Sequence, residues 1–295
     1  MKKKSEQSFG VRSMNLVDIR RLVIISMFSD DDLFQRLTLK GGNAVNLVYG
    51  FGSRSSVDVD FSIEDDFDDI EDSKRRIFRA LRIRFAEVRH TVFDEKFERR
   101  PAQSDVASGK WGGYQIEFKL MESAGFEAAS ADKERARREA IIVGPENQRI
   151  FKIQISKHEF CTGKVEAELD DYTIVVYTPA MIAIEKLRAI CQQMPGYTRR
   201  LHPIPRARDF IDIYSTVVGA NIALGNSHSH ELVRNIFAAK EVNLGLIGEI
   251  KNQREFHRQD WPSVELTVSG ELKDFDFYFD FVVDQTRLLE SLWKK

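Results

Sequence analysis

The sequence predicts an α+β fold, in which a core of mixed strands and helices is followed by a mainly helical region. Between residues 37 and 177, short runs of alternating or β-branched residues typical of strands are interleaved with helical periodicity. Thr178-Pro179 then has the form of a helix N-cap followed by proline at the first helical position, and helical patterns dominate after it. We therefore expect two domains, a core at 1–178 and a helical domain at 179–295.

The composition is that of an ordinary globular protein. With 295 residues and 42% hydrophobic content the chain can bury a full core. Its 44 basic and 46 acidic residues balance, so any attraction to nucleic acid must come from local patches. Cys161 and Cys191 lack the spacing of a metal, redox or disulfide site, which favours a reducing cytoplasm. Lys2–Lys4 are not followed closely by an apolar run, and Leu22–Phe28 is too short to cross a bilayer. We expect neither a signal peptide nor a membrane span.

The N-terminal elements follow from a change of periodicity. Residues 14–36 carry apolar side chains at helical spacing, which predicts an amphipathic helix. The segments that follow predict a strand at 37–39, a break at Gly41-Gly42, a short helix at 44–49 and a strand at 57–63.

The remaining elements follow from the same patterns. Apolar residues at helical spacing predict a basic helix at 74–89, and a second basic helix is predicted at 133–138. Further strands are predicted at 114–120, 151–156 and 172–177. Helices are predicted from Pro179 to Ile190, from about Arg206 onward, and in the tail from Phe275 to Trp293.

Asp58 and Asp60 are the first candidate for chemistry. In a strand, residues two apart point to the same face, so both carboxylates aim together while Val59 points the opposite way. Two carboxylates plus substrate phosphates are the usual way in which a protein holds Mg²⁺. The alternative is a solvated pair of carboxylates without a ligand.

Gly41-Gly42 is the second candidate, because it precedes a predicted helix start. Without side chains in the way, backbone N–H groups can approach an anion such as a triphosphate, and the helix dipole favours it. The alternative is a plain turn between a strand and a helix. Each motif is short, and short motifs also occur by chance.

Longer segments resemble a known family. Lys40–Leu47 followed by Arg54–Phe61 closely resembles the first motif of the AbiEii-type nucleotidyltransferases. This family belongs to the DNA polymerase β-like superfamily and includes toxins of abortive-infection and type IV toxin–antitoxin systems, among them the MenT toxins. Tyr177–Pro179, Ile184–Ala189 and Arg206–Tyr214 are similar to the later motifs, in the same order. The resemblance covers about residues 37 to 215.

The resemblance implies a polymerase β-like core with a mixed sheet, and a site completed by the helical domain. The catalytic residues that it implies are Asp58, Asp60, Lys186 and Asp209. The nucleotide-binding residues are Gly41, Gly42, Asn43 and Lys186. Chemically, Lys186 can contact triphosphate oxygens, and Asp209 can orient that lysine or accept a proton. The alternative is a surface ion-pair ladder on one helix, formed by Arg206, Asp209 and Asp212.

The chain departs from the family pattern at two places. Gly42 stands where a serine is usual, and Asn43 could supply a side-chain hydrogen bond instead. Relatives often have an acidic residue where this chain has Gln154. Glu117, which alternates with apolar neighbours in a predicted strand, is our candidate for a third metal ligand beside Asp58 and Asp60. A strand-edge ion pair is the alternative for Glu117.

Two kinds of charged segment remain. The basic helix at 74–89 and a cluster of Arg199, Arg200, Arg206 and Arg208 could contact an RNA backbone. The acidic run at 64–72 is an equally good partner for the basic helix. The histidines lack the spacing of metal ligands, so we expect surface or structural roles for them, and we interpret Trp111 as a packing residue.

The expected activity is a metal-dependent nucleotidyl transfer. An acceptor hydroxyl would attack the α-phosphate of a nucleoside triphosphate, pyrophosphate would leave, and Mg²⁺ or Mn²⁺ would neutralise the developing charge. The resemblance implies RNA as acceptor, particularly the 3′ end of tRNA, and a toxin countered by a separately encoded antitoxin. The alternatives are a small-molecule or protein acceptor, a kinase-like transfer of the γ-phosphate, and an inactive fold that binds RNA or protein.

Overall fold

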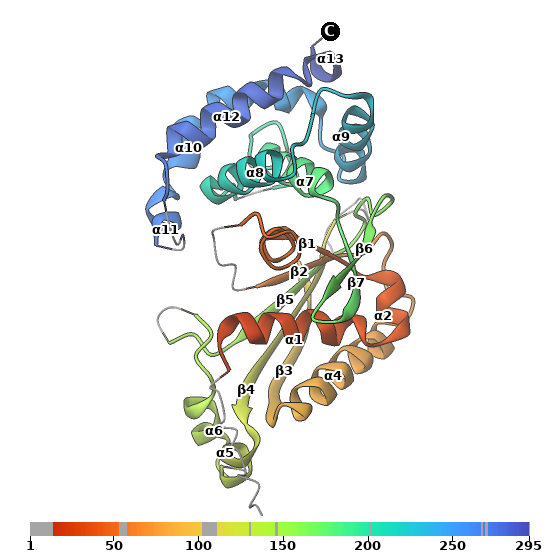
Figure 1. Cartoon of the computed structure of the whole chain (residues 1–295), viewed down its shortest axis with the longest axis vertical. Helices are drawn as coiled ribbons and strands as arrows, with labels where there is room; N and C mark the ends of the chain where they lie inside the picture. Colours follow the sequence, from red (N-terminus) through yellow and green to blue (C-terminus); the bar gives the residue numbers. More distant parts are fainter. Residues whose placement is uncertain are drawn as a thin grey trace, which may run out of the picture.

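The computed structural model describes residues 14–52, 58–101, 111–129, 131–144, 147–200, 202–266, 268 and 271–294. A mixed sheet forms the N-terminal part, and a layer of helices from the C-terminal part lies over one end of it (Figure 1). Lys2–Lys4, on which the prediction about a signal peptide rests, lie outside the described residues. So do Arg54–Val57 of the first motif.

The sheet has seven strands in the order β3-β4-β5-β2-β1-β7-β6. The strands are β1 (Thr38–Lys40), β2 (Val59–Ser62), β3 (His90–Arg100), β4 (Gly113–Glu122), β5 (Phe151–Ser156), β6 (Val165–Leu169) and β7 (Tyr172–Val176). The central strand β2 pairs antiparallel with β1 and parallel with β5. Hydrogen bonds on both sides therefore fix the strand that carries the predicted carboxylate pair.

Helices α1 (Leu16–Phe28) and α4 (Ile70–Glu87) pack on the sheet, and α2 (Asp31–Arg36) packs against both of them. The helix predicted at 14–36 is two helices, because the Asp30 carboxylate accepts from the backbone N–H groups of Asp32 and Leu33 and starts a second one. As predicted, α4 buries an apolar face. The sheet and these helices share one core.

The Gly41-Gly42 break is a short helical turn, α3 (Gly41–Asn43), which continues into the π-helical segment η1 (Ala44–Val48). This agrees with the predicted order of strand, turn, helix and strand. Two further helices, α5 (Ser123–Ala128) and α6 (Lys133–Glu139), follow β4, and α6 confirms the second predicted basic helix.

Two edge strands were not predicted. β3 ends in the sequence KFERR, whose charged residues are largely exposed because only one side of an edge strand is paired. β6 has only weak apolar alternation and turns into β7 through Asp170-Asp171, both of which have positive φ angles, 48° and 66°. Two such residues in αL form the type of tight turn that joins hairpin strands.

The C-terminal part is helical, as predicted. Its elements are α7 (Pro179–Cys191), α8 (Ala207–Gly219), α9 (Ser227–Ala239), η2 (Leu244–Asn252), α10 (Arg254–Arg258), α11 (Trp261–Glu265), α12 (Phe275–Arg287) and α13 (Glu290–Trp293). Thr178 caps α7 by accepting from the Met181 N–H, with proline in the first turn. Phe210 of α8 packs on Phe275 and Phe279 of α12, with ring centroids 5.6 and 5.2 Å away.

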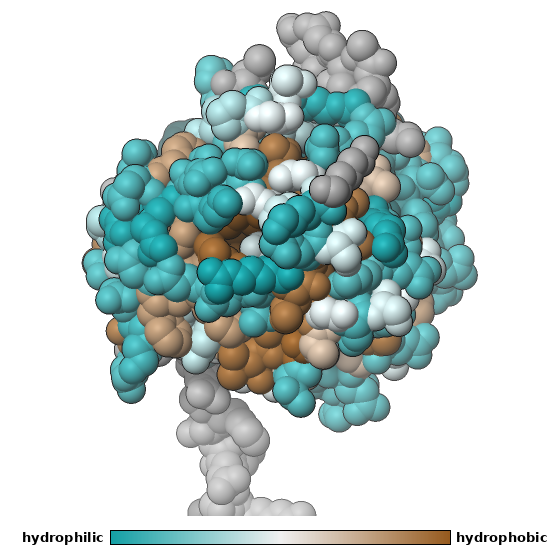
Figure 2. Space-filling model, turned by 90° about the horizontal axis from the view of Figure 1, so that it is seen from above, coloured by the Kyte–Doolittle hydropathy of each residue, from teal (hydrophilic) through white to brown (hydrophobic). Residues whose placement is uncertain are grey.

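The predicted α+β class is therefore confirmed. The division into two domains at Thr178 remains a prediction. Seen from above, the helical region presents a largely hydrophilic surface with a patch of hydrophobic side chains (Figure 2). Across the described residues, every helix is too short or too polar to cross a bilayer.

Candidate active site

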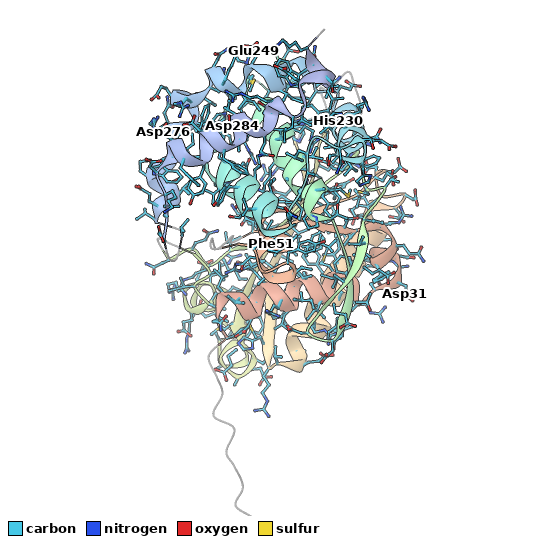
Figure 3. All side chains as sticks on the ribbon, turned by 45° about the horizontal axis from the view of Figure 1, so that its top comes forward. Asp31, Phe51, His230, Glu249, Asp276 and Asp284 are labelled. Carbon is cyan, nitrogen blue, oxygen red and sulfur yellow. The ribbon has the colours of Figure 1, made fainter. Side chains whose placement is uncertain are left out.

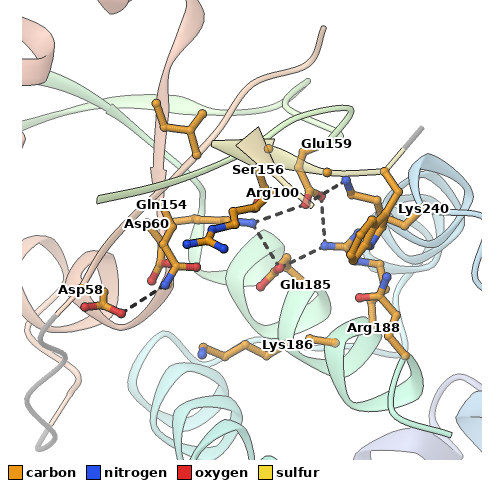
Figure 4. Close-up of a pocket in the computed structure, with 18 of the residues that line it drawn as sticks. Asp58, Asp60, Arg100, Gln154, Ser156, Glu159, Glu185, Lys186, Arg188 and Lys240 are labelled. Carbon is orange, nitrogen blue, oxygen red and sulfur yellow. Dashed lines mark hydrogen bonds and ion pairs between the residues drawn. The ribbon is translucent and has the colours of Figure 1, made fainter. Parts of the chain in front are cut away.

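A pocket of about 560 Å³ lies where the helical region meets the sheet. The sheet contributes residues from β1, β2, β4 and β5, and the helical region contributes residues from α7, the start of α8 and the end of α9. The predicted residues Gly41, Gly42, Asp58, Asp60, Lys186 and Asp209 all line it. Residues that are far apart in the sequence thus share one cavity (Figure 4).

Asp60 lies in the central strand β2, and Asp58 comes directly before it. Asp60 lies opposite Gln154 of β5 on one side and opposite Lys40 of β1 on the other. Val59 and Phe61 are fully buried on the opposite face, as the alternation predicted. The packing of these two neighbours therefore fixes which face of β2 presents Asp58 and Asp60 to the pocket.

The glycine turn lies against the carboxylate pair. Gly41 has a φ of +73°, and a Cβ there would lie 2.8 Å from the nearer carboxylate oxygen of Asp60. Only glycine allows both this backbone conformation and this close approach. Asn43 is buried, and its side-chain amide donates to the Asp58 carbonyl at 2.6 Å. It thereby fixes the backbone that enters β2.

Lys186 binds two carboxylates of the helical region. Its Nζ lies 3.0 Å from Asp209 Oδ1 and 2.7 Å from Asp212 Oδ2. Arg206 contacts the second carboxylate oxygen of Asp209. Asp209 is fully buried and Asp212 is 5% exposed, so the alternative of a surface ladder is wrong. Arg206 and Lys186 hold the pKa of Asp209 well below its ordinary value, although its burial acts in the other direction.

His257 holds the start of α8. Arg206 is the N-cap residue of this helix, which has no side-chain cap of its own. Nδ1 of His257 accepts from the Arg206 backbone N–H at 3.1 Å. The ring is buried against Phe210, and burial lowers the pKa of His257 to about 4. A neutral ring is what this acceptor role requires.

The pKa values of the carboxylates on the sheet are raised, whereas that of Asp209 is lowered. Burial raises the pKa of Asp60 to about 6, although Lys40 and Lys186 lower it. Burial also raises the pKa of Asp58, against the effect of Lys152 and a hydrogen bond from Gln154. The nearby cations therefore do not compensate this pair fully, and a bound divalent cation would keep both groups ionised.

Glu117 does not join this pair. It lies on β4 opposite Lys152 of β5, so a whole strand separates it from β2. Its carboxylate accepts from Gln115 at 2.6 Å and lies 3.9 Å from Lys96. This contact with Lys96 agrees with the alternative of an ion pair at the edge of the sheet. The residue beside the pair is Gln154, whose amide donates to Asp58 at 3.1 Å.

The donors present nevertheless suit Mg²⁺. Within the described ranges, no three acidic, histidine or cysteine side chains gather in a way that could hold a metal ion. Mg²⁺ is usually bound by one or two carboxylates together with substrate phosphates and water. Asp58 and Asp60 supply this number of carboxylates, and Glu117 as a ligand remains a prediction.

A second buried cluster was not predicted at all. Glu159, from the segment after β5, lies 3.5 Å from Lys40, 3.0 Å from Arg188 and 3.5 Å from Lys240. Glu185 lies 3.4 Å from Lys40 and 3.0 Å from Arg188. These three cations hold the pKa of Glu159 at about 2. The cluster connects the sheet to α7 and α9 at the pocket wall, and because its members are scattered in sequence, no spacing signals it.

Most of the basic side chains of α4 pair with carboxylates of the same chain. Arg76 binds Asp30, Asp32 and Asp72, and Arg82 binds Glu95. The acidic run thus supplies one of these partners, and other segments supply the rest. By contrast, Arg200, Arg206 and Arg208 line the pocket. Arg199 instead binds Glu241.

Comparison with known proteins identifies the family. The family model described as "Nucleotidyl transferase AbiEii toxin, Type IV TA system" matches residues 23–281. The chain belongs to this family. As the resemblance implied, it is thus a member of a nucleotidyltransferase toxin family of type IV toxin–antitoxin systems.

Two solved structures from Helicobacter pylori are similar to this AbiEii-family chain. JHP933 is 14% identical with a TM-score of 0.44, and the match covers 94% of this chain and 90% of that one. A protein described as a candidate nucleotidyltransferase is 14% identical with a TM-score of 0.47, and the match covers 95% of each chain. No curated protein matches the chain.

Proposed function

We propose that this chain transfers a nucleoside monophosphate from a nucleoside triphosphate to the 3′-terminal hydroxyl of tRNA. The reaction would use Mg²⁺ or Mn²⁺ and would make the protein a cytoplasmic toxin, countered by a separately encoded antitoxin. One observation carries the proposal. Asp58 and Asp60 from the sheet line the same pocket as Lys186 and Asp209 from the helices.

The pocket suits a triphosphate in size and charge. Eight basic and five acidic side chains of the described residues line its 560 Å³. A triphosphate brings several negative charges, which this excess of basic groups attracts. The backbone at Gly41-Gly42 is free of side chains and begins a helical turn beside Asp60, where N–H groups can approach phosphate oxygens.

The protein groups have separable roles in this reaction. The acceptor hydroxyl gives up its proton to solvent as its oxygen forms a bond to the α-phosphorus, and the bond to the leaving pyrophosphate breaks. Mg²⁺, held by Asp58 and Asp60, would stabilise the charge that develops on these oxygens. Asp209 is fully buried and strongly favours its ionised form, so it suits orienting Lys186 better than accepting a proton. Lys186, aligned by Asp209 and Asp212, would contact the triphosphate.

A transfer assay tests the proposal. The protein is incubated with Mg²⁺, total RNA and each nucleoside triphosphate labelled at the α- or γ-phosphate. We expect transfer of the α label to tRNA, and loss of this transfer in Asp60→Asn and Lys186→Ala. Asp284→Asn is a matched control, because it makes the same carboxylate-to-amide change at an exposed residue of α12 that does not line the pocket (Figure 3).

The other outcomes identify the alternatives. An α label on a small molecule or a protein would assign a different acceptor, and transfer of only the γ label would assign a kinase. If no label moved to RNA, protein or small molecules, an inactive binding module would be left.

A further inference from the structure

Trp111 differs from the other two tryptophans, because it does not pack in the hydrophobic core formed by the described residues. Trp261 and Trp293 pack in the core of the helical region. Trp111 lies just before β4, lines the pocket, and is absent from the hydrophobic clusters formed by the described residues. Our interpretation of Trp111 as a packing residue is therefore wrong. A partly exposed aromatic ring on the wall of a polar pocket is a surface on which a planar ligand can stack.

Hydrogen bonds place Trp111 near Lys240. The carbonyl of Gly112 accepts from the Lys157 N–H at 3.1 Å, and the Lys157 carbonyl accepts from Lys240 Nζ at 2.5 Å. In Figure 4, Lys240 and Arg188 lie at the opposite side of the pocket from Asp58. The pocket therefore has a carboxylate end and a Trp111–Lys240 end.

The sheet register gives the distance between the two ends. Asp60 lies opposite Gln154, and Gln154 lies opposite Gln115, so two strand spacings separate β2 from β4. Trp111 precedes Gln115 by four residues. Because β4 begins only at Gly113, standard strand dimensions give an upper limit of roughly 16 Å for the distance between the backbones of Asp60 and Trp111. The two side chains shorten this gap to about the reach of one nucleotide, from α-phosphate to base.

The Trp111–Lys240 end also carries hydrogen-bonding groups. Arg188 is 2% exposed, lines the pocket, and its Nε and Nη1 have no hydrogen-bond partner in the structure. Buried guanidinium N–H groups are normally satisfied, so two unsatisfied ones mark a place where a further acceptor fits after small side-chain adjustments. Gln192 lines the same pocket and adds a side-chain amide.

We propose that the Trp111–Lys240 end binds the nucleobase of the nucleoside triphosphate. This inference rests on the proposed function, and it adds the position of the base to it. The base stacks on Trp111, while the triphosphate extends to Gly41-Gly42, Lys186 and the carboxylate pair. Because every base offers a face for stacking, Trp111 supplies affinity and the polar groups near it supply the choice of base.

Binding measurements with and without a base test the proposal. Dissociation constants of nucleoside triphosphates and of inorganic tripolyphosphate are measured by calorimetry in Mg²⁺, for the full-length protein and for Trp111→Leu. Loss of stacking should weaken nucleotide binding about tenfold. Tripolyphosphate, which has no base, should bind both proteins equally. Trp111→Phe, which keeps an aromatic face, should retain most of the nucleotide affinity.

Fluorescence gives a second test that does not depend on the Leu variant folding. The chain has three tryptophans. A base stacked on Trp111 should quench the emission of the wild-type protein when nucleotide is added, whereas tripolyphosphate should not. In Trp111→Phe the quenching should disappear while nucleotide still binds.

The outcomes separate this proposal from the proposed function. If the wild-type protein bound no nucleotide, both would fail. If it bound nucleotide but Trp111→Leu changed the affinities for nucleotide and tripolyphosphate equally, or neither, only the base site would be wrong. Quenching by RNA and not by nucleotide would likewise overturn it, because Trp111 would then bind the acceptor.

Discussion

Two sets of carboxylates, one on the sheet and one on α8, stand in opposite electrostatic situations, and Asp58, Asp60 and Asp209 among them line the pocket. Asp58 and Asp60 stand on the sheet, and burial raises the pKa of both. Asp209 and Asp212 stand on α8, where Lys186 contacts both of them and Arg206 contacts Asp209. The pKa of Asp209 is lowered well below its ordinary value. Because burial acts on both sets, the opposite directions of the pKa shifts come from the cations near each set.

This difference predicts different consequences for stability at the two sets of carboxylates. The carboxylates on α8 are compensated by the protein itself, so their ion pairs form when the chain folds. The pair on the sheet retains a destabilising burial term that a bound cation would remove. Substitutions on the α8 side should therefore reduce stability, and also activity through the alignment of Lys186, whereas substitutions on the sheet should reduce activity alone.

The largest expected effect is on turnover in Asp60→Asn. Removing one of the two carboxylates that we propose to hold Mg²⁺ should lower the rate of nucleotidyl transfer by about a thousandfold or more, since such metal contacts supply several kcal/mol. The melting temperature should stay the same or rise, because a buried carboxylate with a raised pKa is lost. A clear fall in the melting temperature would contradict the comparison, and Asp284→Asn is the control for both measurements.

The next effect is on stability in Asp209→Asn. Breaking a buried ion-pair network at one partner should lower the free energy of unfolding by about 3 kcal/mol, because Arg206 and Lys186 lose a buried counter-charge. Urea denaturation of the variant and the wild type measures it. An exposed pair, Asp284 with Arg287, provides the matched control, and its loss should change stability by less than about 1 kcal/mol. If Asp209→Asn and the loss of the Asp284–Arg287 pair lowered the free energy of unfolding equally, the buried network would not be more important for stability than an exposed pair.

A smaller effect concerns the pH dependence of stability. The folded-state pKa of His257 is about 4, below its ordinary value of 6.5. The unfolded chain therefore takes up this proton first. Stability from the neutral ring is fully present above about pH 6.5 and is lost as the pH falls towards 4, by roughly 2 to 3 kcal/mol.

His257→Asn tests this assignment. The asparagine carbonyl can still accept from the Arg206 N–H but does not titrate. At pH 8 the variant should keep most of its stability, and between pH 6.5 and 4 its unfolding free energy should fall less than that of the wild type. Parallel curves for the two proteins would show that His257 does not titrate as described.

The smallest effect is expected on α4. Arg82 binds Glu95 and is 58% exposed, so Arg82→Ala should change stability by less than about 1 kcal/mol and leave RNA affinity unchanged. Arg208→Ala, at the pocket, should instead weaken RNA binding and reduce its dependence on salt concentration. Affinity measurements at two or more salt concentrations compare the two variants. If only the α4 variant bound RNA more weakly, the RNA-binding surface would lie on α4 and not at the pocket.

Local sequence patterns predicted most of the fold because they reflect local physics. The cap at Thr178, the apolar face of α4 and the alternation around Asp60 each depend on residues a few positions apart. The edge strands β3 and β6 were not predicted, since only their position at the two ends of the sheet lets charged residues stand in a strand. The placement of Glu117 could not be predicted either, because the sequence does not reveal that β5 lies between Glu117 and Asp58.

By itself, the sequence determined the residue types that the site uses, namely two carboxylates at strand spacing, a glycine turn, and a lysine and an aspartate on later helices. Only the tertiary structure decided their surroundings. It brought Arg206 and Lys186 to Asp209, surrounded Glu159 with three cations, and placed Trp111 on the pocket wall. The physical reason is that pKa values and ligand contacts depend on distances between residues far apart in the chain, and these distances exist only once the helices have packed onto the sheet.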